Sequence, residues 1–369
     1  MIEFALVAFA AALVVAAALV PIARRVALAA GLVAAVRPGR LHTEPRACGG
    51  GLAIADTLIL VVGGGWLLAS LMAAESLPGW LPPRVQEHLD ARTPTLVRLA
   101  VGALVFFIIG LLDDRYSLPA WPKLGLQLFA AALAVVGLGI KATVWLEAPY
   151  AAEVVSILWI VAVVNAYNML DHADGLAAAV GVVALVALAV GQMMMGEWFV
   201  PGVALVTAGA LAGFLIYNLP PARLFMGDAG SHLVGYLLAS LTIVARYYFP
   251  TLATPGYVVL VPLVVLTVPL FDAACVVVGR LARGKNPMVG DATSHFGHRM
   301  LARGAGPRTV VFVAAGLTAA TGAASLILYS ADDRLPAAAC CLVALTLATV
   351  LLARRRSRTT APPDAEEPS

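Results

Sequence analysis

Long apolar runs, separated by short polar stretches, follow one another along most of this chain. A helix needs about 20 apolar residues to cross the hydrocarbon core of a bilayer. The pattern therefore predicts an all-α, polytopic membrane protein with about 11 spanning helices, in which residues 1–353 form a single transmembrane domain and 354–369 a tail, first basic and then typical of disorder. The predicted spans are 3–23, 50–73, 96–112, 124–141, 153–170, 175–193, 199–217, 231–249, 257–279, 309–329 and 336–353.

The positions of the basic residues predict the orientation of these helices. If the N-terminus lies outside, most of the 24 Lys and Arg residues fall in the inner connections and the tail. The cytoplasmic loops of membrane proteins carry such an excess. An odd number of spans then puts the C-terminus in the cytoplasm, so the count and the charges agree.

Composition narrows the class of protein. Hydrophobic residues make up 61% of the chain and charged residues 12%, against about 45–50% and about 25% in soluble domains. The mean hydropathy is +0.92. A water-soluble globule, a disordered chain and a disulfide scaffold are therefore excluded. The net charge of +3 is too small to suggest nucleic acid as a partner.

Five acids stand at the inner ends of predicted helices. Asp113 and Asp114 follow the third helix, Asp171 and Asp174 the fifth, and Asp228 the seventh. These three helices run in the same direction, so the carboxylates share the cytoplasmic face. Carboxylate and amide oxygens suit a hard cation such as Mg²⁺, which keeps room for substrate phosphates. We expect an active site at this face.

Basic and glycine-rich segments complement these acids. Lys123 follows the acidic pair, and a long inner loop carries His295, His298 and Arg299 among other cations. Such cations could hold a diphosphate bridged by a metal ion. The two histidines are three residues apart, and no third ligand has a matching spacing, so we reject zinc. No glycine-rich segment fits a P-loop, which argues against an ATP-driven machine.

Four segments together resemble a known family, the polyprenyl-phosphate N-acetylhexosamine-1-phosphate transferases of glycosyltransferase family 4. The likeness extends from about residue 37 to 300 and is closer to the WecA-like than to the MraY-like enzymes. Two departures stand out: His172 replaces a usual glycine, and residues 295–298 replace a denser histidine motif. The segments are Arg40–Arg46 followed by Gly49 and Gly50, Leu111–Asp114 with Lys123 and Gln127, Asn165–Leu176, and Arg223–Ser231.

The resemblance implies a reaction and a set of site residues. The reaction is the transfer of a sugar 1-phosphate from a UDP-sugar to polyprenyl phosphate, with release of UMP. Mg²⁺, or Mn²⁺ in its place, would be held by Asp228 and Asn168. Uracil would be held by Asp174 and Phe225. The implied catalytic residues are Asp113, Asp114, Lys123 and Asp171, and the further substrate-binding residues are Asn165, His295, His298, Arg299, His42 and Arg46.

The part played by Asp113 stays open at this point. Asp113 and Asp114 are the candidates for a base that acts on the prenyl phosphate. The second pKa of a phosphate monoester is about 6, so the nucleophile is already mostly dianionic at neutral pH. The pair would then position a metal ion or Lys123 instead.

The expected donor is UDP-GlcNAc or a close UDP-N-acetylhexosamine, and the acceptor is undecaprenyl phosphate or a similar lipid. Such an enzyme would lie in the inner membrane of a bacterium, with a homodimer as a candidate assembly, and would start lipid-linked cell-envelope glycans. One alternative is the phospho-MurNAc-pentapeptide transferase of peptidoglycan synthesis. A lipid-intermediate transporter is another, but it would need polar residues along its path, and mid-span acids are few: Asp56 and Asp272.

Overall fold

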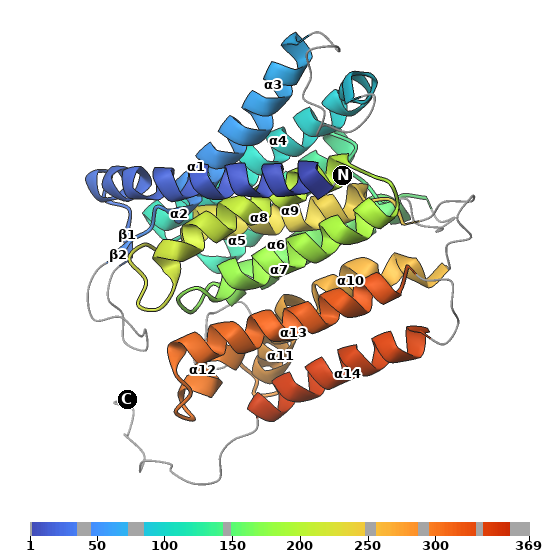
Figure 1. Ribbon diagram of the computed structural model, residues 1–369. Coiled ribbons are helices and arrows are strands. Elements are labelled where there is room, and N and C mark those ends of the chain that lie inside the picture. Colours follow the sequence, from blue (N-terminus) through green and yellow to red (C-terminus); the bar gives the residue numbers. More distant parts are fainter. Residues whose placement is uncertain are drawn as a thin grey trace, which may run out of the picture.

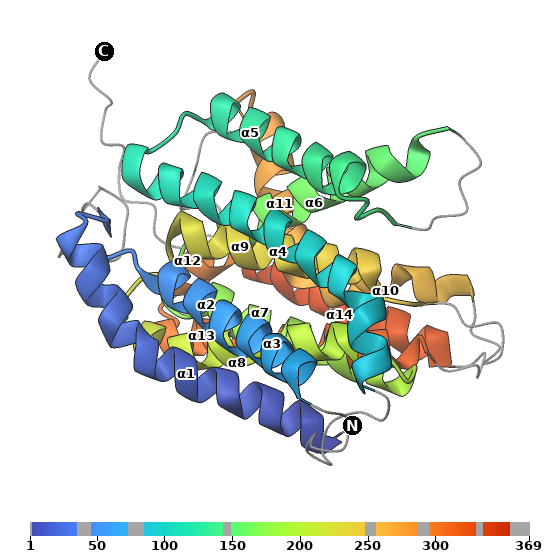
Figure 2. The ribbon, with the colours of Figure 1, turned by 90° about the horizontal axis from the view of Figure 1, so that it is seen from above.

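A computed structural model of the protein describes residues 2–34, 46–72, 85–142, 149–247, 256–286, 295–329 and 335–354. Long helices lie side by side and give an elongated bundle (Figure 1 and Figure 2). The tail after residue 354 and His42 lie outside the described residues. The predicted helical class is therefore confirmed over the part of the chain that the structure describes.

The helices agree with the apolar runs, although several differ in length from the prediction. In order, the elements are α1 (Ile2–Ala29), β1 (Val33–Ala34), β2 (Arg46–Ala47), α2 (Gly50–Leu58), η1 (Ile59–Gly63), α3 (Gly64–Leu71), α4 (Val85–Tyr116), α5 (Ala120–Ala132), η3 (Leu133–Gly137), α6 (Ala151–Leu170), α7 (Leu176–Met194), α8 (Phe199–Asn218), α9 (Gly227–Val244), η5 (Gly256–Leu260), α10 (Val261–Val265), α11 (Thr267–Leu281), α12 (Phe296–Leu301), α13 (Pro307–Ile327) and α14 (Leu335–Arg354).

Not every predicted span is long and apolar enough to cross a bilayer unaided. Within the described residues eight helices meet that condition, or nine if a bent pair counts as one span. Helix α9 does not, because its first two turns carry the polar residues Asp228, Ser231 and His232. The region 257–279, predicted as one span, consists of η5 with α10 and then α11, which meet at a bend of 68°. The full count of eleven stays a prediction.

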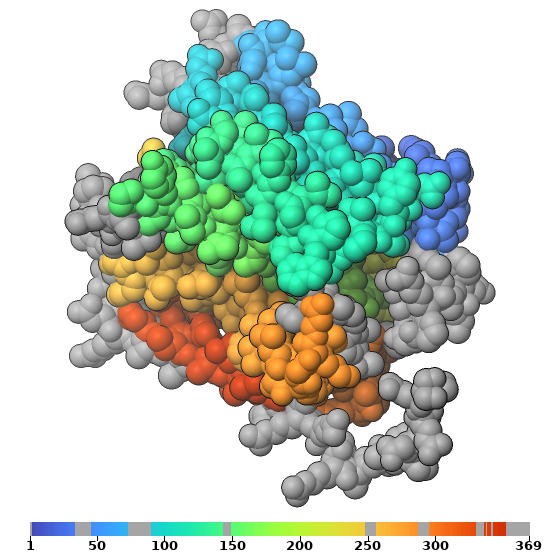
Figure 3. Space-filling model, turned by 180° about the vertical axis from the view of Figure 1, so that it is seen from behind, coloured from blue at the N-terminus to red at the C-terminus, as the bar shows by residue number. Residues whose placement is uncertain are grey.

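Helices α8 and α9 are the most buried helices of the bundle. In the most apolar 18-residue stretch of α8, 78% of the residues are buried, against 22% in the corresponding stretch of α1. The outer side of α1 exposes large apolar residues, as a lipid-facing helix does. On its inner side α1 buries Ala12 and Ala16 against Gly209 and Gly213 of α8. Small residues spaced four apart let two helix backbones approach closely. From behind, α5 and α6 lie above the orange and red C-terminal helices (Figure 3).

A small exception to the all-helical prediction lies at one end of the bundle. Strands β1 and β2 pair antiparallel, with Val33 opposite Ala47. The backbone N–H of Phe225 donates to the Ala47 carbonyl at 3.0 Å, and the N–H of Gly50 donates to the Phe225 carbonyl at 2.9 Å. The segment after α1 is thereby fixed to the segment that precedes α9. We call this end, where α4 also meets α5 (left in Figure 2), the site end.

Candidate active site

A lysine surrounded by oxygen atoms lies at the site end. The Nζ atom of Lys123, in the first turn of α5, lies 2.5 Å from an oxygen of Asp113 at the end of α4. It lies 3.3 Å from Asp228 Oδ1 in the first turn of α9 and 3.2 Å from Asn168 Oδ1 near the end of α6. These four residues form the carboxylate–lysine cluster. Four helix ends thus bring two carboxylates, an amide and an ammonium group together.

Several atoms of the cluster are oriented by further contacts. Asn168 Nδ2 donates to Asp228 Oδ1 in a short hydrogen bond and to Ser231 Oγ at 2.8 Å. The other oxygen of Asp113 accepts the backbone N–H of Leu118 at 2.8 Å, which closes the turn between α4 and α5. The cluster is partly buried, with 16% of the Lys123 side chain and 8% of the Asp113 side chain exposed. The side chains are therefore oriented while an opening to solvent remains.

Asp114 has a different partner from its neighbour Asp113. Its two oxygens accept the backbone N–H groups of Asp228 at 2.8 Å and of Ala229 at 2.9 Å. The first N–H groups of a helix have no partner within the helix, so this carboxylate caps α9. Gly227 has a φ of +75°, and a Cβ there would lie 2.7 Å from an Asp114 oxygen. Asp114 therefore acts on the cluster by fixing the backbone of Asp228.

A buried polar layer lies behind the cluster. His232 contacts the Asp228 carbonyl through Nδ1 at 2.6 Å, and its Nε2 lies 2.8 Å from Gln127 Nε2. Because a carbonyl only accepts, Nδ1 carries the proton and Nε2 accepts from the Gln127 amide. The Gln127 oxygen accepts from Asn165 Nδ2 at 2.8 Å. Asn165 is thus linked to the cluster through Gln127 and His232 and supports it from behind.

Asp174 and Phe225, which the resemblance implies as uracil ligands, both contact Arg46. The Arg46 Nη1 atom lies 3.4 Å from Asp174 Oδ2, and its guanidinium carbon lies 5.7 Å from the centre of the Phe225 ring. The same Asp174 oxygen accepts the backbone N–H of Ala222 at 2.8 Å. The side chains of Arg46 and Asp174 are each 26% exposed. Solvent can therefore reach this group.

A cavity of about 540 Å³ adjoins this group. Three charged residues, Arg46, Asp174 and Arg308, line the cavity. The rest of its wall, which includes Pro220 and Pro221, is mainly apolar. Arg308 Nε donates to the Pro220 carbonyl at 3.1 Å. A volume of this size lies within the usual range for small-molecule sites. The cavity therefore fits a small, partly apolar ligand that also carries polar or charged groups.

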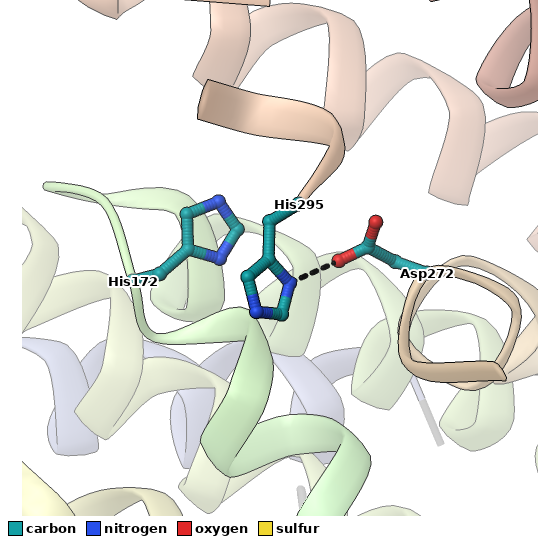
Figure 4. A group of neighbouring side chains, drawn as sticks. All are labelled: His172, Asp272 and His295. Carbon is teal, nitrogen blue, oxygen red and sulfur yellow. Dashed lines mark hydrogen bonds and ion pairs between the residues drawn. The ribbon is translucent and has the colours of Figure 1, made fainter. Parts of the chain in front are cut away.

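Three imidazole rings and one acid form a second cluster, the histidine cluster (His172, Asp272, His295 and His298). His295 Nδ1 donates to Asp272 Oδ2 at 2.8 Å, and the other oxygen of Asp272 accepts the Phe296 N–H that begins α12, at 2.9 Å. The His172 ring stacks on His295 at 4.5 Å and on His298 at 4.9 Å. Figure 4 shows His172 on one side of His295 and Asp272 on the other.

His172 lies in the turn between α6 and α7, and its Nδ1 lies 3.0 Å from the Met169 carbonyl. Burial, helped by the neighbouring His295, lowers the pKa of His172 to about 3. This ring is neutral at physiological pH. Its Nδ1 carries the proton, because its partner is a carbonyl.

Two groups of donor atoms at the site end suit metal ions. The carboxylate–lysine cluster offers oxygen atoms that already surround one cation, the Lys123 ammonium, and such a set fits Mg²⁺. His172, Asp272 and His295 offer atoms within 4.8 Å of one another. The rejection of zinc rested on the lack of a third ligand with matching spacing. Sequence spacing could not reveal Asp272 and His172, which come from other elements.

The structure brings most of the predicted site residues to one end of the molecule. Asp171 ends α6, directly after the turn that carries Asn168. Arg299 follows His298 on α12. Sequence reasoning missed His232, Asp272 and Arg308 as parts of the site. The only signal for Asp272 was its charge within an apolar run, and His232 was hidden directly after a recognised motif.

Comparison with known proteins identifies the family. The family model described as glycosyl transferase family 4 matches residues 96–246. A probable undecaprenyl-phosphate N-acetylglucosaminyl 1-phosphate transferase of Bacillus subtilis is 32% identical over 315 residues, which cover 83% of this chain and 80% of that protein. The chain therefore belongs to glycosyl transferase family 4. It is a multi-pass membrane enzyme of the phosphotransferase class.

Two further relatives represent different branches. A decaprenyl-phosphate N-acetylglucosaminephosphotransferase of Mycobacterium tuberculosis is 30% identical over 363 residues, or 90% of this chain and 84% of that protein. A phospho-N-acetylmuramoyl-pentapeptide-transferase of Streptococcus thermophilus is 34% identical over 165 residues, or 39% of this chain and 47% of that protein. The likeness to the first kind extends over much more of the molecule.

Proposed function

We propose that this enzyme transfers GlcNAc 1-phosphate from UDP-GlcNAc to a polyprenyl phosphate, in a Mg²⁺-dependent reaction that releases UMP. The observation that carries the proposal is the carboxylate–lysine cluster, in which Asp113, Asn168 and Asp228 surround a single cation at the ends of four helices. The relatives that match most of the chain are named as polyprenyl-phosphate N-acetylglucosamine phosphotransferases. Their names support the sugar and the acceptor.

Asp228 and Asn168 are the residues that would hold Mg²⁺. Both present oxygen atoms beside Lys123, and Asp114 fixes the backbone of Asp228. When bound there, Mg²⁺ would offset the negative charge of the diphosphate and of departing UMP. To hold the ion, Asn168 would turn its amide oxygen toward it. The present contact of that oxygen with Lys123 already favours this orientation.

Lys123 and Asp113 would act on the phosphates directly. The Lys123 ammonium can donate to phosphate oxygens while Asp113 holds it in place. A polyprenyl phosphate is already mostly dianionic at neutral pH, since its second pKa is about 6. A proton-abstracting base therefore adds little, and we assign Asp113 the task of orienting Lys123.

The nucleotide would bind beside Asp174, with its base over the Phe225 ring. The cavity of about 540 Å³ next to Asp174 offers space for the uridine. Arg46 now contacts both groups, so it must leave the Phe225 ring when uracil stacks there. Its guanidinium would then be free to pair with the diphosphate, as arginine does in planar, bidentate contacts.

We also propose where the reaction takes place and what its product is used for. The charge distribution favours a site on the cytoplasmic face of a bacterial inner membrane, where a soluble nucleotide sugar and a lipid phosphate can meet. One phosphoanhydride replaces another, so the exchange is nearly balanced and needs no ATP. The lipid-linked sugar would start a cell-envelope glycan.

A donor panel tests the proposal. Purified enzyme in detergent receives undecaprenyl phosphate, Mg²⁺ and one of UDP-GlcNAc, UDP-GalNAc or UDP-MurNAc-pentapeptide, and UMP release and the lipid product are measured. We expect UDP-GlcNAc, or a close UDP-N-acetylhexosamine, to be the best donor. Turnover of UDP-MurNAc-pentapeptide with none of UDP-GlcNAc would move the enzyme to the peptidoglycan branch.

A further inference from the structure

The ring of His172 fills the space that a side chain at position 297 would need. Gly297 lies in the first turn of α12 and is buried. A Cβ atom placed on Gly297 would lie 2.7 Å from His172 Nε2, closer than real side chains allow. It would also lie 3.3 Å from Val310 and 3.4 Å from Leu176. The two departures from the family pattern, His172 and the segment 295–298, are therefore in direct contact.

The same ring supports both histidines of α12. It stacks on His295 with an angle of 23° between the ring planes, and on His298 with an angle of 29°. His295 is also fixed by Asp272. The orientation of the α12 histidines thus depends on a ring that comes from another part of the chain, the turn after α6.

His172 makes this contact at a cost in hydrogen bonding. Its Nδ1–H donates to the Met169 carbonyl, which leaves only a lone pair on Nε2. That Nε2 atom is buried and has no hydrogen-bond partner within the described residues. A neutral imidazole with no free proton offers nothing to a phosphate oxygen. Toward a phosphate, His172 therefore supplies only the shape of its ring.

We propose that His172 is a positioning residue whose ring, fitted against Gly297, holds His295 and His298 in the orientation that receives the sugar phosphate of the donor. The task given to His295 and His298, which the family resemblance implies as substrate-binding residues, rests on the proposed function. The fit between His172 and Gly297 does not. The two parts therefore have separate tests.

The first test measures transfer by four variants. His172→Ala should lower kcat about tenfold while the KM for polyprenyl phosphate changes less than twofold, because the lipid phosphate does not depend on α12. Gly297→Ala should lose at least as much. The exchange variant His172→Gly/Gly297→His, which returns one imidazole to the same space, should regain at least a third of the wild-type kcat. Gly316→Ala, at an open position of α13, is the matched control and should be neutral.

The second test does not depend on activity. In detergent, Gly297→Ala should lower the unfolding temperature of the otherwise wild-type protein but not of the His172→Ala variant, in which the space is free. If Gly297→Ala alone does not fold, the double variant His172→Ala/Gly297→Ala should fold. Equal destabilisation in both backgrounds, or failure of the double variant to fold, would overturn the fit.

The outcomes separate the two claims. An exchange variant that folds yet is no more active than the single variants would overturn the positioning role. If the wild-type enzyme transfers sugar phosphate from no donor, the proposed function fails and the positioning role fails with it. The thermal comparison then still decides the fit between His172 and Gly297.

Discussion

The carboxylate–lysine cluster and the histidine cluster lie at the same end of the molecule but are held by different forces. In the first, opposite charges meet within hydrogen-bonding distance, and Asp113 is also fixed by a backbone N–H. In the second, one acid orients one histidine and stacking orients the others, and one nitrogen of His172 has no hydrogen-bond partner within the part of the chain that the structure describes. Removal of one member from a partly buried ionic network leaves a charge uncompensated. Removal of a stacked ring mainly changes the packing around the remaining histidines.

This comparison predicts that the largest losses of activity come from variants of the first cluster. Asp228→Asn should give the largest loss, on the order of a thousandfold in kcat, since several kcal/mol of charge stabilisation in the transition state are removed. The protein should still insert and purify normally. The measurement is UMP release at ordinary Mg²⁺. Near-normal turnover would refute the metal assignment.

A matched control exists at the opposite end of α6. Glu153 lies in its first turn, and its carboxylate accepts from Lys141 Nζ at 2.8 Å. Glu153→Gln removes an acid from a lysine pair without touching the site end. Its activity should stay within twofold of wild type.

Lys123→Ala should follow, with a loss of roughly a hundredfold, because the carboxylates of Asp113 and Asp228 would then face each other without the ammonium between them. Part of the loss should be recovered at high Mg²⁺, which can replace the missing charge. Lys141→Ala is the control. A Lys123→Ala enzyme with more than half of the wild-type rate would show that the cluster is structural.

Asp113→Asn should lose less, about tenfold to thirtyfold, because Asp228 and Asn168 still contact Lys123. We expect the same loss from pH 6 to pH 9, since the carboxylate orients Lys123 and takes no proton. Rates across this range check the prediction. A loss that grows toward low pH, where more of the lipid phosphate is protonated, would instead assign Asp113 as a general base.

Asp272→Asn should have the smallest effect, about tenfold on kcat/KM for the donor, because His295 loses its orienting acid but keeps the stacked His172. Binding of UMP, which lacks the sugar, should change less than twofold in calorimetry. A thousandfold loss would mean that the histidine cluster carries the chemistry and would reverse the comparison.

The two clusters also differ in how far sequence could predict them. Asp113, Lys123 and Asp228 stand in polar segments between apolar runs, so their charges indicated them, whereas the role of Asn168, inside the predicted span 153–170, was implied by the family resemblance alone. The contact between His172 and Gly297 depends on the approach of α12 to the turn after α6, which no local pattern reveals. The capping of α9 by Asp114 was hidden for the same reason, because its partners are more than 100 residues away.

Helix positions were predicted well and their irregularities were not. Apolar runs define where a helix can lie in a membrane, but they do not indicate the 68° bend between α10 and α11. The same holds for the β1–β2 pair, which is only two residues long in each strand and is supported by Phe225 from a distant segment.

The central claim is that sugar-phosphate transfer takes place at the carboxylate–lysine cluster and needs a divalent cation. The most direct test supplies purified enzyme with UDP-GlcNAc labelled in the sugar and with undecaprenyl phosphate, and follows label in the lipid fraction as Mg²⁺ is titrated after EDTA treatment. We expect labelled lipid and equimolar UMP to appear only when both undecaprenyl phosphate and Mg²⁺ are present, and almost none of either with Asp228→Asn. Labelling that is independent of Mg²⁺, or undiminished in Asp228→Asn, would contradict it.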